Sequence, residues 1–179
     1  MDAIVKYMIE RKWANDEKSD RKKYLFKLAQ QSKKQVEISH KIGGMLIYNQ
    51  LIEEFLKDII ELSINYIKAE IWPADVSLKV DFTKLTFGKL INEFKQYATI
   101  EHNREILLDY LKKYNLKRNE VVHNLFEIED MDKLAKELDE YALLADEIVF
   151  LLLEYDHSVC EKFCDLDNRV DFNDFADDE

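Results

Sequence analysis

Apolar residues recur every three or four positions along most of this chain, which is the spacing of amphipathic helices. One long stripe follows Gly43 and Gly44 and ends at Trp72 and Pro73, and a second begins near Asp130. The first consists of Met45, Tyr48, Ile52, Phe55, Ile59, Leu62 and Tyr66, and the second of Leu134, Leu138, Tyr141, Ala145, Ile148, Leu152, Tyr155 and Val159. Alternating steps of three and four predict two long helices that pack at a shallow angle.

Shorter stripes predict the remaining helices. Residues 3–38 indicate one or two helices with a break near residues 14–16. Helical spacing resumes at about Thr86 and again at about Glu101, and a short helix is expected over residues 116–126.

A different pattern precedes Thr86, where Val76, Leu78, Val80 and Phe82 alternate with polar residues. A period of two is typical of a strand, but a lone strand has no partner in such a fold. Two interpretations remain open: an extended connection that lies on the helices, or a segment that pairs across an oligomer.

Glycine and proline are scarce, with three glycines and one proline in 179 residues. Average usage is about 7% glycine and 5% proline. Sandwiches, barrels and glycine-rich nucleotide loops need more turn residues than this and are excluded. With 47% apolar and 35% charged residues, the expected fold class is all-α, a helical bundle of about five to seven helices.

The net charge of −11 is distributed unevenly. Residues 165–179 hold seven acids and one arginine, whereas residues 11–34 hold nine basic residues and three acids. The overall acidity argues against a general nucleic-acid coat but leaves a local basic groove open. The acidic end either mimics nucleic acid and guards such a groove or aids solubility.

No apolar run is long enough to cross a membrane, and Asp2 and Lys6 replace the apolar core of a signal peptide. We therefore expect a cytoplasmic protein with reduced thiols. His157, Cys160 and Cys164 share a helix face, so a metal site is conceivable if another segment adds a ligand. The alternative is a packing face that continues Val149 and Leu153.

The sequence from Arg118 to His123 stands out because an arginine sits in the middle of an apolar stripe. At about 100° per residue, the apolar neighbours Val121, Val122 and Leu125 flank the direction of Arg118, while Asn119 and His123 lie along one edge. Arg118 either pairs with a buried acid, with His123 as an ordinary boundary residue, or belongs to an anion-binding face. In the second case the positive end of the short helix would add to the attraction for phosphate.

The string from Arg118 to His123 resembles the R-N-x-x-x-H form of the R-x4-H signature of HEPN domains (higher eukaryotes and prokaryotes nucleotide-binding). The surroundings resemble the family order over about residues 40–157: a long helix with Tyr48 and the run 51–54, then the run 86–91, the signature and a closing long helix. We expect one domain over residues 1–164, with a basic helical region at 1–38, and an acidic tail at 165–179.

The resemblance implies a metal-independent endoribonuclease without a cofactor, active as a homodimer through the signature helices, of the toxin or antiviral-defence kind. Arg118 and His123 would be catalytic and Asn119 an accessory polar residue. Attack of a ribose 2′-OH on the adjacent phosphate would leave 2′,3′-cyclic phosphate and 5′-OH ends. Histidine carries a proton near neutral pH, and arginine stabilises charge on the phosphate.

Two features depart from the family pattern. Leu125 stands where one toxin subgroup has a tyrosine, so regulation by modification of that tyrosine is not expected. The chain is also longer than the minimal domain at both ends. Lys112, Lys113 and Lys117 are candidates for contacts with the RNA backbone, or are exposed helix charges.

Besides RNA, an antitoxin or defence-system partner is expected. Two alternatives stay open: a non-catalytic HEPN-like module that binds RNA or a nucleotide, and a helical protein-interaction domain in which Arg118 forms an ordinary ion pair.

Overall fold

A computed structural model describes residues 17–71, 77–125 and 130–167, and in these ranges it contains no β-strand. The prediction of an all-α fold is therefore confirmed. The α-helices are α2 (Glu17–Lys33), α3 (Ile38–Glu70), α4 (Phe87–Tyr97), α5 (Arg104–Asn124) and α6 (Met131–Asp167), and the 3₁₀ helix η1 (Phe82–Lys84) precedes α4. The predictions for residues 3–16 and 168–179 lie outside the described residues.

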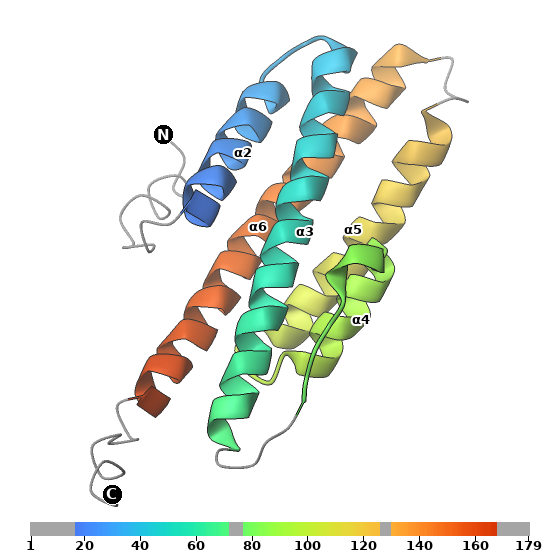
Figure 1. The fold of residues 1–179 in the computed structure, drawn as a ribbon. Helices are drawn as coiled ribbons and strands as arrows, with labels where there is room; N and C mark the ends of the chain where they lie inside the picture. The colour runs from blue at the N-terminus through green and yellow to red at the C-terminus, as the bar shows by residue number, and fades with distance from the viewer. Residues whose placement is uncertain (1–16, 72–76, 126–129, 168–179) are drawn as a thin grey trace, which may run out of the picture.

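The helices α3 and α6 form the centre of the bundle and run in the same direction (Figure 1). Two polar contacts follow this parallel direction: Lys41 of α3 pairs with Asp139 of α6, and the Tyr48 hydroxyl further along α3 donates to Asp146. The helices α2 and α5 run the opposite way on either side, and the short α4 packs against α3 and α5.

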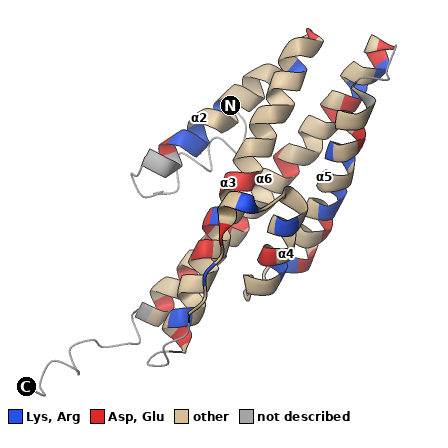
Figure 2. Ribbon diagram, turned by 45° about the vertical axis from the view of Figure 1, so that its right-hand side comes forward, with Lys and Arg blue, Asp and Glu red and all other residues tan. Residues whose placement is uncertain are grey.

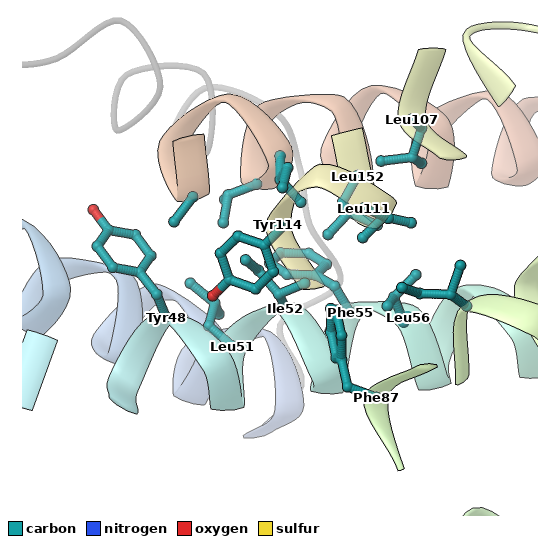
Figure 3. Close-up of a cluster of buried hydrophobic side chains, with 14 of the residues drawn as sticks. Tyr48, Leu51, Ile52, Phe55, Leu56, Phe87, Leu107, Leu111, Tyr114 and Leu152 are labelled. Carbon is teal, nitrogen blue, oxygen red and sulfur yellow. The ribbon is translucent and has the colours of Figure 1, made fainter. Parts of the chain in front are cut away.

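Both predicted stripes face the core. All eight residues of the α6 stripe are buried, as are the first five of the seven in the α3 stripe. Figure 3 shows aromatic and aliphatic side chains from α3, α4, α5 and α6 meeting in one cluster, with Phe55 of α3 and Tyr114 of α5 among them. Burying each such side chain stabilises the fold by roughly 1.5–3 kcal/mol.

The helix α3 begins at Ile38, five residues before the expected start at the glycine pair. Gly43 and Gly44 are therefore inside the helix. A glycine within a helix disfavours it by only about 1 kcal/mol relative to alanine. Of the two, Gly44 lies directly against Ser32 of α2, where a side chain would not fit.

The alternating segment before α4 is an extended connection that lies on the bundle. Leu78, Val80 and Phe82 are partly buried against the core, whereas the intervening Lys79 and Asp81 are exposed. The first of the two interpretations is therefore the one observed, and Val76 lies outside the described residues.

Candidate active site

The helix that carries the motif is longer than predicted. Residues 104–124 form the single helix α5, whereas the sequence pattern predicted one helix from about Glu101 and a separate short helix over 116–126. The buried stripe runs without a break through Tyr114, Arg118 and Val121. Tyr114 and Val121 are fully buried and the Arg118 side chain between them is 29% exposed. Arg118 thus occupies a core position and still reaches the surface.

Two side chains from other helices contact the Arg118 guanidinium. Its Nη2 atom lies 3.5 Å from Oε1 of Glu53 on α3. Its central carbon lies 5.3 Å from the centre of the buried Phe87 ring at the start of α4, within the range of a cation–π interaction. Contacts from α3 and α4 therefore hold the guanidinium that α5 supplies. The sequence pattern did not identify Glu53 as the partner of Arg118.

A buried polar cluster lies close to this arginine. The hydroxyls of Tyr114 and Tyr141 both donate to Oδ1 of Asn49, at 2.9 and 2.5 Å. Burial raises the pKa of each hydroxyl well above its usual range, and the positive charge of Arg118 partly opposes that rise. Sequence reasoning missed Asn49, although a polar residue within the apolar stripe of α3 was a usable signal.

The predicted residues share one pocket. Arg118, Asn119 and His123 line a hollow of about 410 Å³ together with Val122 and with Glu53 across from them, and the start of α4 completes the wall. Asn119 and His123 are exposed. The arrangement offers a fixed cation, an amide and an imidazole to one ligand, which are the groups that phosphate chemistry requires.

The expected contribution from the N-terminal end of a short signature helix is wrong. The helix α5 begins at Arg104, which is about 21 Å along the axis from Arg118 at 1.5 Å per residue. His123 instead lies in the last turn, where the helix dipole is negative. The helix start that borders the pocket belongs to α4, through Thr86 and Phe87.

The three candidate lysines do not gather at the pocket. Lys117 faces α6 and lies 3.6 Å from Glu140, and Lys113 pairs with Asp109 at 2.9 Å. Exposed Lys112 is the one that shares the helix side of Asn119 and His123. Figure 2 shows basic and acidic residues interspersed along α5 rather than a continuous basic stripe.

The described part of the basic segment near the N-terminus, which forms α2, lies away from the candidate site. The helix α2 packs on the side of α3 opposite α4 (Figure 1). Some of its cations pair with acids of other helices, among them Arg21 with Glu54 at 2.9 Å and Lys22 with Asp58 at 2.5 Å. Arg21 and Lys22 therefore anchor α2 to α3, and no described residue of α2 lines the pocket.

The group of His157, Cys160 and Cys164 lies near the end of α6. His157 Nε2 is 2.6 Å from Oε1 of Glu161, and burial raises the pKa of the Cys160 thiol to about 11. Cys164 is exposed. Within residues 17–71, 77–125 and 130–167, no cluster of three histidine, cysteine or acidic side chains has the geometry to hold a metal ion.

Among the described helices, none combines the length and apolar character required to cross a membrane. No protein-family model, curated protein or solved structure matches this chain.

Proposed function

We propose that this protein is a HEPN-like, metal-independent endoribonuclease of the cytoplasm, acting as a toxin or antiviral-defence effector. The observation that carries the proposal is the shared pocket, in which Arg118 is held at a core position while Asn119 and His123 stand exposed beside it. An arginine retained in an apolar stripe and open to a pocket is better explained by an anionic ligand than by packing alone.

The proposed reaction uses these side chains directly. A ribose 2′-OH gives up its proton to a base and its oxygen attacks the adjacent phosphorus, while the bond from phosphorus to the 5′ oxygen breaks. His123 exchanges the protons, because an imidazole titrates near neutral pH. The Arg118 guanidinium stabilises the negative charge that develops on the phosphate oxygens, and Asn119 hydrogen-bonds the substrate.

Dimer formation through α5 is part of the proposal. Val122, next to His123, is 42% exposed, and Leu46, two turns before Glu53 on the same face of α3, is 58% exposed. A second copy of this chain placed over the site would cover both of these apolar side chains. Each reaction centre would then contain two imidazoles, one to accept and one to donate a proton.

The test is RNA cleavage by the purified protein in EDTA, with analysis of the product ends. The wild type is expected to leave 2′,3′-cyclic phosphates, and His123→Ala and Arg118→Ala are each expected to lower the rate at least about 100-fold. His40→Ala and Arg21→Ala are matched controls, since both side chains are exposed and lie outside the pocket. Cleavage that survives His123→Ala, or that requires a metal, would contradict the proposal.

The ion pair with Glu53 also supports a second candidate function, a helical interaction module in which Arg118 is structural. In that case no RNA is cleaved or bound. Arg118→Leu is then less stable than the wild type, because it leaves Glu53 without its partner, whereas the double variant Arg118→Leu with Glu53→Leu replaces the whole ion pair by apolar packing and is as stable as the wild type or more so.

A further inference from the structure

The candidate pocket contains an acid directly opposite its arginine. Glu53 projects from α3, and its side chain is 30% exposed. Within the described ranges, Arg118 is the only cation that pairs with it. The contact of 3.5 Å is longer than the 2.7–2.9 Å or so of a strong charge-assisted hydrogen bond. The pair is therefore formed by one oxygen and is open to competition.

The charges of the pocket follow from this pairing. With Arg118 and Glu53 both ionised and His123 neutral, the side chains that line the pocket have no net charge. When a phosphate group approaches Arg118, the Glu53 carboxylate is already paired with the guanidinium. Binding then requires that the phosphate replace the carboxylate, which remains nearby as a like charge.

We propose that Glu53 is a competing carboxylate that excludes small anions from Arg118 and admits only a ligand able to make further contacts along the pocket. This inference rests on the proposed function, because it takes a phosphodiester strand as the ligand. Inorganic phosphate can contact only Arg118, and the Glu53 carboxylate competes with it for that cation. A strand adds contacts at Asn119, at His123 and at exposed Lys112, and these repay the displacement.

The arrangement is a form of specificity by repulsion. A protein distinguishes two ligands by the difference between their binding free energies, and a fixed like charge penalises the ligand with fewer compensating contacts. Many cellular metabolites carry phosphate, so an unopposed arginine in an open pocket would be occupied by them.

The experiment compares Glu53→Gln with wild type, using Glu54→Gln as the matched control. Glu54 is the next residue on α3 and loses the same charge, but it pairs with Arg21 of α2. The probe is a fluorescent 2′-O-methyl RNA oligonucleotide in EDTA, which lacks the attacking hydroxyl and so separates binding from cleavage. Inorganic phosphate serves as the competitor.

We expect Glu53→Gln to bind the oligonucleotide about tenfold more tightly than wild type, as expected for removal of one like charge at a partly solvated site. Phosphate should compete in Glu53→Gln at concentrations that leave the wild type unaffected. Glu54→Gln should match the wild type in both respects, and adding Arg118→Gln to Glu53→Gln should abolish the gain.

Binding by Glu53→Gln that equals or falls below wild type would overturn the inference, since Glu53 would then hold Arg118 in place rather than oppose its ligand. Absence of binding by both proteins would overturn it as well. If the wild type cleaves no RNA but Glu53→Gln still gains affinity through Arg118, the ribonuclease proposal fails and the inference stands.

Discussion

Gly44 of α3 lies so close to Ser32 of α2 that a β-carbon on Gly44 would be 2.8 Å from the Ser32 β-carbon. Gly43, one residue earlier in the same helix, faces open space at the corresponding point. Two adjacent glycines therefore have opposite surroundings, and only one of them sets the distance between α2 and α3.

Alanine at these two positions should have opposite effects on stability. Gly44→Ala is expected to destabilise the protein by about 1–3 kcal/mol, because the added methyl group forces α2 away from α3. Gly43→Ala is expected to stabilise it by up to about 1 kcal/mol, through the better helix propensity of alanine. Urea denaturation of both variants tests this, and equal effects would contradict the described contact.

Asn49 is expected to be essential for stability, because its side-chain oxygen accepts hydrogen bonds from two buried tyrosines. Asn49→Ala leaves the Tyr114 and Tyr141 hydroxyls without this acceptor, which should destabilise the protein by about 2–4 kcal/mol. Asn65→Ala is the control, an exposed asparagine on the same helix. Thermal melts in which the two variants are equally stable would contradict the role given to Asn49.

Asp156 should make the stability of the protein depend on pH. Burial raises the pKa of its carboxyl above 3.8, the positive charge of Lys22 opposes that rise, and Asp58 adds to it. A carboxyl whose pKa is raised on folding reduces stability as the pH rises through the folded-state pKa, since the charged form is then retained in a buried place. Asp156→Asn should therefore be more stable than wild type at pH 7.

The advantage of Asp156→Asn should shrink as the pH falls and should vanish below 3.8, where the carboxyl becomes neutral in both folded and unfolded chains. Urea midpoints measured at several pH values test this sign. A difference between the two proteins that stays constant from pH 4 to pH 7 would exclude the raised pKa as its cause.

The two cysteines should differ in reactivity. Partial burial raises the pKa of the Cys160 thiol to about 11, whereas Cys164 is exposed one turn later on α6. Because the thiolate is the reactive form, Cys160 should react with a maleimide at least about tenfold more slowly at pH 7. Mass spectrometry of Cys160→Ser and Cys164→Ser gives the two rates, and equal rates would contradict the described burial.

The helix faces were predictable because periodicity reports burial directly. Every residue of the α6 stripe was identified from spacing alone, from Leu134 to Val159. The ends of the individual helices were harder to predict than their buried faces. The sequence pattern predicted a break before residue 116, whereas residues 104–124 form one helix, in which Arg118 contacts Phe87 and Glu53 of other helices.

Some residues of the candidate site were predictable from the sequence and others were not. Arg118, Asn119 and His123 lie on one helix, so their grouping follows from sequence spacing. Glu53 and the start of α4 reach the pocket through tertiary packing, and no local pattern connects residues 53 and 118. The acid that balances the charge of the arginine could be found only from the folded chain.

The parallel arrangement of α3 and α6 has a consequence for synthesis of the protein. Tyr48 and its acceptor Asp146 are 98 positions apart, and the apolar face of α3 finds its largest partner only in α6. While the chain emerges from the ribosome, the part of that face that α6 covers stays in water until α6 is made, a condition that favours aggregation. Assembly of this bundle therefore depends on contacts of long sequence separation, which slow folding relative to helical proteins built from neighbouring hairpins.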